Sequence, residues 1–395
     1  MTALIRIFGR GAVFVALMLC VSGGFAHAGD HPFDKWFKYS ADIESAWVVE
    51  GNPADPLTVT VRPKNGTGLL KKVMVLYPRP SSAYDIAIST IFRVFTNKEI
   101  NAEFKIVNFE LNDQKGAAVI RDAEQNAFDL IFSMGSESTA WLDEKYRGGK
   151  LPVVTVCSKD PVELGQMPDY ETGSGRNFAF TSLNVPVDVQ MAYVRELRAD
   201  LKNIAILVDS KNISAVQTQA EPIADYARAH GINVVWTSVQ NPKKAAEELS
   251  TIVPDAVRTM RKTDPELKNS LFWLTGSTSV FREIRTINRH ADRVPVVSVV
   301  PEIVAPGSET AVLAVGISFE SNAKLAAIYG SQILGGKSAG KLKVGVVSPP
   351  DVAISFAKAR EIGMRVPFNF FEIANFVYDY QGNPVRSVKN ELPTN

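Results

Sequence analysis

Cysteine, histidine and surplus charge are all scarce in this sequence of 395 residues. It contains two Cys and four His, and its 43 Lys and Arg nearly balance 42 Asp and Glu, for a formal net charge of +1. Two cysteines exclude a disulfide framework and a cysteine-rich metal site. A charge near zero argues against nucleic acid as a partner, because contacts with phosphates need a basic surplus.

Long apolar runs are also absent, except for a short one near the N-terminus. Arg6 and Arg10 precede an apolar stretch over 13–21, and Ala26-His27-Ala28 resembles a signal-peptidase cleavage site. This pattern predicts a signal peptide over 1–28, cleaved at about Ala28, and hence a protein exported to the periplasm. No later stretch approaches the roughly 18 apolar residues of a membrane span, so we expect a soluble mature chain.

Two other interpretations of the N-terminus are weaker. A membrane anchor would need a longer apolar run than 13–21. Lipoprotein processing at Cys20 is disfavoured because the large Leu19 precedes it, where a small residue is usual. Cleavage after Ala28 would remove Cys20, leave Cys157 alone and change the formal net charge to −1.

Common catalytic motifs are missing as well. The sequence has no HExxH, GxxxxGK[ST], GxGxxG after a strand or GxSxG elbow. His230 and His290 lie near the ends of expected helices, where a cation suits the helix dipole. Cys157 has no histidine nearby in the sequence that could activate it. These absences argue against an enzyme without excluding one, because the α/β architecture by itself is also found in enzymes; we predict that the protein is not an enzyme.

What is present is a rhythm of apolar strands and amphipathic helices that runs through the chain twice. In the first half we expect strands at 73–77, 104–107, 129–133 and 152–156, and helices at 85–97, 115–127 and 137–146. In the second half we expect strands at 204–208, 234–236, 271–274 and 294–299, and helices at 214–230, 243–262 (interrupted near Pro254) and 280–291. This predicts an α/β protein of two Rossmann-like lobes with parallel sheets.

The remaining segments are too short for a third lobe. After 311 we expect strands at 312–315 and 344–347 and helices at 322–334, 352–362 and 368–377. Adding them to the two sheets requires several crossings between the lobes, that is, a multi-crossover hinge. The expected domains are an N-terminal extension (29–70), lobe 1 (71–184, completed by about 312–340), lobe 2 (185–311, completed by about 341–380) and a polar tail (381–395).

The extension over 29–70 contains four prolines and one alternating segment at 57–61 that predicts a short strand. It could pack on the main body or serve as an arm that binds a partner, and the sequence leaves both possibilities open.

Small polar residues cluster where the expected strands end. In parallel sheets ligands bind beyond the carboxyl ends of the strands, so these residues are candidates for ligand binding. Helix N-termini in the same loops offer free N–H groups, although capping alone accounts for each residue singly. The candidates are Ser81, Ser82, Tyr84, Gly135, Ser136, Glu137, Ser138, Ser158, Asp160, Asp209, Ser210, Asn212, Thr275, Ser277, Thr278 and Glu302.

Four blocks resemble those of a known family. They are Ser158-Lys159-Asp160-Pro161-Val162, the segment from Leu183-Asn184 through 187–197, Ala314-Val315-Gly316-Ile317-Ser318 before a helix that ends in Gly335-Gly336, and the segment 354–367. Over about 72–380 the chain is similar to the substrate-binding proteins of ABC transporters, which have the fold of type I periplasmic binding proteins. Better-known members bind aromatic amino acids such as tryptophan.

The resemblance implies capture of a small solute in a cleft between the lobes, delivery to an ABC permease and ATPase complex in the inner membrane, and no catalysis or cofactor. A monomer is usual for this class. The segment Val299-Val300-Pro301-Glu302 departs from the family pattern, in which an acidic stretch is common. The solute could therefore be polar without being an amino acid. A sensor of the same fold that reports to a signalling partner is the alternative function.

Overall fold

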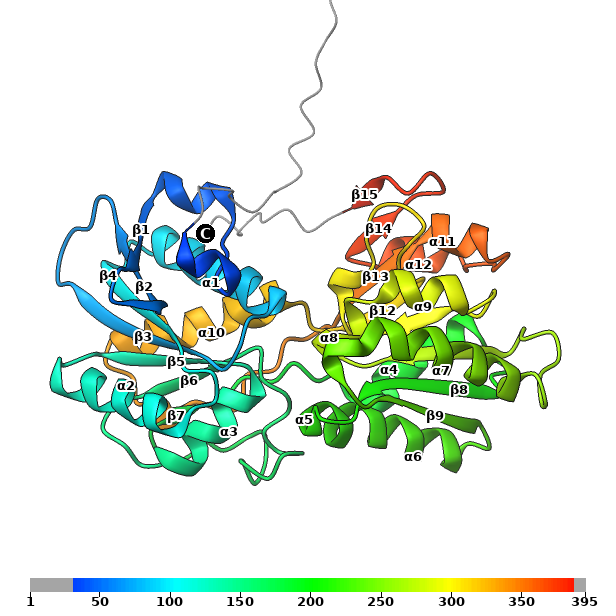
Figure 1. The fold of residues 1–395 in the computed structure, drawn as a ribbon, viewed down its shortest axis with the longest axis horizontal. Helices are drawn as coiled ribbons and strands as arrows, with labels where there is room; N and C mark the ends of the chain where they lie inside the picture. The colour runs from blue at the N-terminus through cyan, green and yellow to red at the C-terminus, as the bar shows by residue number, and fades with distance from the viewer. Residues whose placement is uncertain (1–30, 387–395) are drawn as a thin grey trace, which may run out of the picture.

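The computed structural model describes residues 31–386. The predicted signal peptide (1–28) and the end of the predicted tail (387–395) lie outside the described residues. Two α/β lobes stand side by side, one formed mainly by the first half of the chain and the other by the second (Figure 1). This is the predicted architecture. None of the described helices is long and apolar enough to cross a membrane.

Lobe 1 is built on a seven-stranded sheet. Its strands lie in the order β1 (Trp47–Asn52), β2 (Asp55–Pro63), β4 (Ala102–Asn108), β3 (Lys71–Tyr77), β5 (Leu130–Met134), β6 (Val153–Val156) and β7 (Phe178–Ala179). The strands from β4 to β7 are parallel, whereas β2 pairs with β1 and β4 in the antiparallel sense.

Both faces of this sheet are covered, as its apolar strands predict. On β3, Val73, Val75 and Tyr77 belong to one hydrophobic core, whereas Met74 and Leu76 belong to another. The helices α1 (Ser82–Asn97) and α10 (Phe319–Leu334) pack on each other over the first face. The second face carries α2 (Asp113–Gln125) and α3 (Gly135–Lys145).

Lobe 2 contains an eight-stranded sheet. The strand order is β15 (Pro384–Arg386), β14 (Phe376–Tyr378), β13 (Asp351–Ser355), β12 (Leu313–Gly316), β11 (Val296–Ser298), β10 (Ser270–Leu274), β8 (Asn203–Asp209) and β9 (Asn233–Val239). Its helices are α4 (Val187–Leu197), α5 (Ile213–Ala215), α6 (Glu221–Ala229), α7 (Ala245–Met260), α8 (Thr278–Phe281), α9 (Ile284–His290), α11 (Phe356–Glu361) and α12 (Asn369–Ile373).

The N-terminal extension is part of lobe 1. Its strands β1 and β2 form an antiparallel hairpin that lengthens the first sheet at the edge of β4. Before the hairpin, two short 3-10 helices, η1 (Pro32–Lys35) and η2 (Ala41–Ser45), lie close to α1 (Figure 1). The segment expected as a strand at 57–61 lies inside the longer β2.

Within residues 31–386 the chain passes between the lobes three times. The first passage follows β7, the second joins β12 to α10, and the third precedes β13. The strand β12 belongs to the sheet of lobe 2, because Leu313 and Ala314 pair in parallel with β11. Lobe 1 therefore includes α10 and the short η6 (Ala339–Lys341). The strand expected at 312–315, which the predicted domain boundaries placed in lobe 1, belongs to lobe 2 instead.

Several expected elements near the C-terminus differ in the structure. The segment 344–347 is not a strand and makes only an isolated bridge, between Gly345 and Thr181. The expected helix at 352–362 begins as the buried strand β13 and becomes helical only after Ser355, whose hydroxyl caps α11. The expected helix at 368–377 is the short α12 followed by β14, which pairs with β13.

Two helices of lobe 2 also differ from expectation. The helix α7 continues through Pro254, because its buried face, which includes Leu249 and Val253, holds it on the sheet. The carbonyl that proline leaves unpaired belongs to the exposed Ser250, where it can meet water. The expected helix at 280–291 is instead divided into α8 and α9.

Candidate ligand-binding cleft

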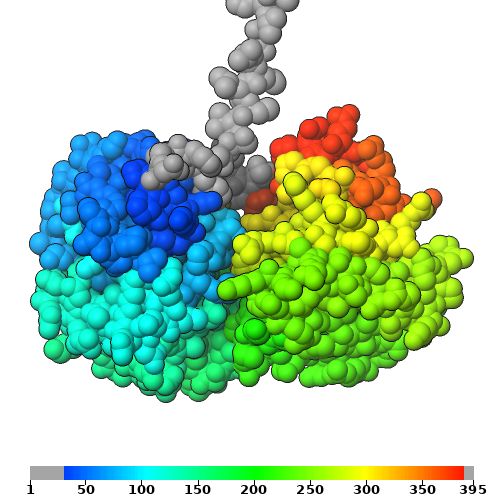
Figure 2. All heavy atoms as spheres, in the orientation of Figure 1, coloured from blue at the N-terminus to red at the C-terminus, as the bar shows by residue number. Residues whose placement is uncertain are grey.

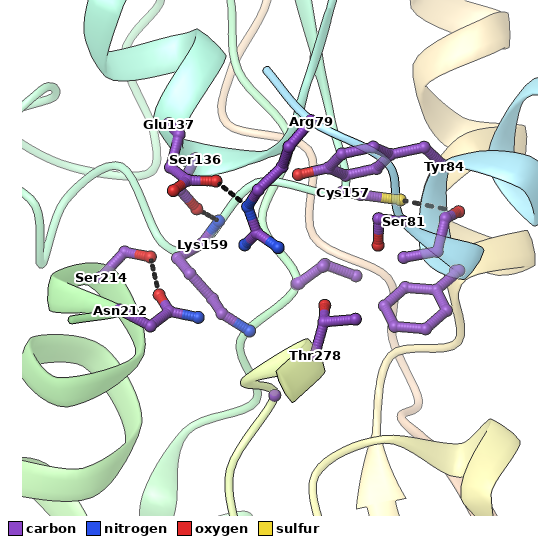
Figure 3. A pocket seen from close by; sticks show the side chains of 14 residues that line it. Arg79, Ser81, Tyr84, Ser136, Glu137, Cys157, Lys159, Asn212, Ser214 and Thr278 are labelled. Atoms are coloured by element: carbon purple, nitrogen blue, oxygen red, sulfur yellow. Dashed lines mark hydrogen bonds and ion pairs between the residues drawn. The ribbon is translucent and has the colours of Figure 1, made fainter. Parts of the chain in front are cut away.

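The two lobes meet along the middle of the molecule (Figure 2), and a cavity lies between them. About 40 Å³ of it can hold the centre of a water molecule, which is room for roughly three waters. Its lining comes from both lobes and from the crossing segments: Arg79, Ser81, Ala83, Tyr84, Ser136, Glu137, Cys157, Lys159, Leu183, Asn212, Ser214, Gly276, Thr278 and Phe319 (Figure 3).

The first turn of α1 supplies one wall. Tyr84 is buried there, and its backbone carbonyl accepts a hydrogen bond from the hydroxyl of Tyr77 at 3.1 Å. The ring lies against Gly135, which has a φ of +77°. A side chain at Gly135 would overlap the Tyr84 hydroxyl, so glycine is needed for both backbone and space. Burial raises the pKa of Tyr84, which keeps the phenol neutral.

Two cations reach the cavity from lobe 1, and they differ in their surroundings. Arg79 follows β3, and its Nε donates to Glu137 Oε2 at 2.5 Å. Lys159 follows β6, and its side chain extends toward lobe 2 (Figure 3). It is 7% exposed, and its Nζ makes no hydrogen bond or ion pair within residues 31–386. Burial lowers the pKa of Lys159 to about 8.

The backbone of Lys159 is fixed, although its ammonium group has no partner among residues 31–386. Its N–H donates to the hydroxyl of Ser136 at 2.9 Å, which ties the loop after β6 to the start of α3. The side chain then lies against Gly276 of lobe 2, where a methyl group would overlap the ammonium. The two lobes therefore touch at this point of the cavity.

The wall from lobe 2 is formed by loops after β8 and β10. Asn212 caps the helix that follows it, because its Oδ1 accepts from the N–H of Ala215 at 3.2 Å and from the Ser214 hydroxyl at 3.0 Å. That leaves the Asn212 Nδ2 group as a donor at the cavity. Thr278 adds a hydroxyl at the start of α8.

Six of the sixteen predicted residues line the cavity, namely Ser81, Tyr84, Ser136, Glu137, Asn212 and Thr278. The cavity also has residues that the predicted set lacked, including Arg79, Cys157, Leu183 and Phe319. Arg79 and Lys159 stand at strand ends in the same loops as predicted residues. A charged residue in such a loop is therefore the signal that could have found them.

Four other predicted residues of lobe 1 lie outside the cavity lining, and two of them, Ser138 and Asp160, hold the loops in shape. The hydroxyl of Ser138 pairs with that of Ser133 at 3.0 Å beneath the sheet edge. Asp160 accepts from the Ser182 hydroxyl at 2.9 Å and from backbone N–H groups of its own loop. Ser158 is buried, and Ser82 is exposed on the outer side of α1. None of these four lines the cavity within the described chain.

The same holds in lobe 2. Asp209 accepts from the Ser279 hydroxyl at 2.6 Å, and Ser210 donates to a backbone carbonyl of β9. The hydroxyls of Thr275 and Ser277 lie 3.1 Å apart and are fully buried. These side chains position the loops that carry Asn212, Gly276 and Thr278.

Glu302 lies away from the cavity. It belongs to η5 (Pro301–Ile303), and its Oε1 accepts from the N–H of Phe319 at 2.5 Å, at the first residue of α10. Burial raises the pKa of Glu302 to about 8, so the carboxyl favours its neutral form near pH 7. The structure thus places the predicted ammonium partner behind the backbone of the hinge.

The amino-acid sequence matches the model of one protein family. A model of the family described as ABC transporter substrate binding protein matches residues 96–377. The chain belongs to that family. Its members are transport components that act outside the cytoplasm, which agrees with the export predicted from the sequence.

The individual relatives are distant. A tyrosine-binding protein of Clostridioides difficile (strain R20291) is 21% identical over 238 residues, which is 60% of this chain and 64% of the relative. The match thus covers slightly less than two thirds of that protein's length.

Solved structures share the fold. An ABC domain of Streptococcus pneumonia in complex with L-Trp has a TM-score of 0.62 at 18% identity, and the match covers 78% of this chain and 100% of that one. A conserved domain protein of Vibrio cholerae also scores 0.62, at 19% identity, with 78% and 99% covered. A ligand-free, open substrate binding protein with adhesive properties from Clostridium difficile scores 0.56 at 17% identity, with 76% and 97% covered.

Proposed function

We propose that this protein is the solute-binding component of an ABC importer in the periplasm. It captures one small polar or amino-acid-like molecule in the cavity between the lobes and presents it to a permease and ATPase complex in the inner membrane. It works as a monomer. The observation that carries this proposal is the cavity itself, whose lining comes from both lobes and from the segments that cross between them.

Closure of the hinge follows from this lining. A solute that touches Arg79 and Tyr84 on one lobe and Asn212 and Thr278 on the other gains its full set of contacts only when the lobes are together. Such a solute binds the closed arrangement better than an open one and shifts the population toward it.

Binding is tested by calorimetry and thermal melting of the mature protein against a panel of amino acids, carboxylic acids and sugars. A solute present at about 100 times its Kd adds about 2.7 kcal/mol of stability, so the true solute raises the Tm by several degrees. Replacing Thr278 by Val removes one hydroxyl of the cavity at constant shape and should weaken binding about threefold to tenfold. Thr259→Val, on the outer side of α7, is the matched control.

Import is tested separately, in the source bacterium, by uptake of the labelled solute in strains with and without the gene. We expect uptake to fall in the deletion strain and to return with the wild-type gene but not with a variant that has lost binding. Normal uptake in the deletion strain, together with tight binding in vitro, would contradict the importer role and favour a sensor.

A further inference from the structure

The ammonium group of Lys159 is the least compensated charge at the cavity. We propose, resting on the function proposed above, that the solute is a small carboxylate without an ammonium group, whose anionic end pairs with Lys159. Its apolar body lies against Tyr84, Leu183 and Phe319.

The first support is the state of Lys159 itself. Only 7% of the residue is exposed, yet its Nζ has neither a carboxylate nor a carbonyl partner in the part of the chain that the structure describes. Burying an unpaired cation costs free energy, and proteins usually pair such a group or give it a ligand. Since the side chain lines the cavity, an anion held there would supply the missing partner.

The second support is that the cavity offers no free acid. Among the described residues that line it, Glu137 alone is acidic, and Arg79 already holds that carboxylate at 2.5 Å. Asp160 is engaged by the Ser182 hydroxyl and by its own loop. Glu302 does not line the cavity; its Oε1 accepts from the backbone of the hinge, and its Oε2 is buried without a hydrogen-bond partner in the described chain. An ammonium group on the solute would therefore find no free partner of opposite charge in the lining.

The third support comes from the other lining groups. Ser81 lines the cavity and has a buried hydroxyl without a hydrogen-bond partner in the described chain, so it is a further free donor. Asn212 and Thr278 add donors from lobe 2, on the side where Lys159 meets Gly276. Tyr84 lies across the cavity from the Lys159 ammonium (Figure 3), and Leu183 and Phe319 add apolar surface to the lining. A cation and apolar surface in one small cavity fit a short apolar acid.

A matched set of compounds tests the charge requirement by calorimetry. Acetate, propanoate and butanoate vary the apolar body within the size of about three waters. 2-Aminobutanoate, butylamine and butanamide keep the four-carbon skeleton but change the charged groups. We expect at least one carboxylate to bind, and butylamine and butanamide to bind at least about 100-fold more weakly than butanoate. Failure of all three carboxylates, or tighter binding of 2-aminobutanoate than of butanoate, would overturn the inference.

Substitution of Lys159 gives a second test, in which the melting temperature and the carboxylate affinity should respond differently. Lys159→Met removes the charge at similar length, so we expect the free protein to melt at an equal or higher temperature while carboxylate affinity falls at least about 100-fold. Lys159→Arg should keep part of the affinity. Lys268→Met, at an exposed pair with Glu266, is the control and should change neither quantity.

The outcomes separate this inference from the proposed function. If the protein binds an amino acid or a sugar with equal affinity in the wild type and in Lys159→Met, the carboxylate inference is wrong and solute binding stands. If the wild type binds no member of any class, both proposals are wrong. A structural role for Lys159 would instead show as a lower melting temperature in Lys159→Met.

Discussion

Asp85 is a buried carboxyl group just behind the cleft. It lies in the first turn of α1, one residue after Tyr84, and is 8% exposed. Its Oδ1 accepts from the backbone N–H of Lys38 at 3.0 Å, which ties the N-terminal extension to the helix. Burial raises the pKa of Asp85 to about 7, because the charged form loses its hydration.

A raised pKa makes this residue a source of pH-dependent stability. The folded protein keeps the proton of Asp85 between about pH 4 and 7, whereas the unfolded chain releases it. The contribution is therefore present at low pH and lost as the pH rises to about 7. Asp85→Asn retains the acceptor for Lys38 but cannot ionise. We expect it to match the wild type near pH 4 and to be more stable by up to about 4 kcal/mol at pH 8, measured by urea unfolding.

Asp225→Asn is the control for this prediction, because Asp225 is an exposed helix residue that pairs with Arg228. It should change stability little at either pH. An equal effect of Asp85→Asn at pH 4 and pH 8 would mean that ionisation of Asp85 does not limit stability.

At the scale of residues, the positions of strand ends predict loops rather than individual lining residues. The predicted strand ends include the loops of Ser81, Ser136, Asn212 and Thr278, which line the cavity. A serine or threonine in such a loop can cap a helix, brace the loop or face the cavity, and one sequence does not separate these uses. Asp160 and Ser277 brace their loops, whereas Arg79 reaches the cavity through a long side chain.

Among the elements, the N-terminal extension has the closest link to the cleft. Trp36 and Phe37 are buried against Tyr77, with ring centroids 5.7 and 6.2 Å away. Tyr77 in turn packs on Tyr84 and donates to its carbonyl. The extension thus supports the aromatic wall of the cavity from behind.

Trp36→Ala tests this support. The indole is 5% exposed and donates to the carbonyl of Pro56 at 2.9 Å, so its removal leaves a cavity and an unpaired acceptor. We expect a loss of about 3 to 5 kcal/mol in the free energy of unfolding, measured with urea. Hydrogen exchange should also become faster at the first turn of α1. Val48→Ala, on the outer face of β1, serves as the control. It should change neither the free energy of unfolding by this amount nor the hydrogen exchange of α1. Unchanged exchange at Tyr84 in Trp36→Ala would contradict the supporting role of the extension.

Regular elements in the middle of the chain followed from apolar periodicity, whereas the C-terminal ones did not. The segments that became β13 and β14 contain apolar residues at spacings that also suit a helix. The strand β13 pairs with β12, which lies far back in the sequence, and β14 in turn pairs with β13. Local patterns do not record such long-range pairing. The conformation of 344–347 also depends on a distant segment, because this part of a crossing runs beside Thr181.

The whole molecule is organised around α10. Its body packs on α1 of lobe 1, but its N-terminus is held by two acids from lobe 2. Glu302 accepts from the N–H of Phe319, and Asp351 accepts from that of Ser318 at 2.9 Å. These two hydrogen bonds hold the crossing between β12 and α10 in place. Away from the crossings, the lobes are held together by contacts across the cleft.

Gly276 of lobe 2 lies in close contact with Lys159 of lobe 1, and its substitution tests hinge closure. A methyl group there would overlap the ammonium of Lys159 and would lie 3.2 Å from Gln219 Oε1. Either lobe alone can accept it, since the lysine is free to swing away, but the closed arrangement loses its fit. We expect Gly276→Ala to weaken solute binding about tenfold with little change in melting temperature.

Small-angle scattering should report the same change in shape. In the wild type we expect a saturating solute to decrease the radius of gyration, because the ligand selects closed lobes. In Gly276→Ala the decrease should be smaller at the same solute concentration. Gly335→Ala, at the end of α10 with its nearest neighbour at 3.4 Å, is the control and should close as the wild type does. If the radius of gyration of Gly276→Ala decreases as much as that of the wild type, close contact between Lys159 and Gly276 is not needed for closure, and this prediction is wrong.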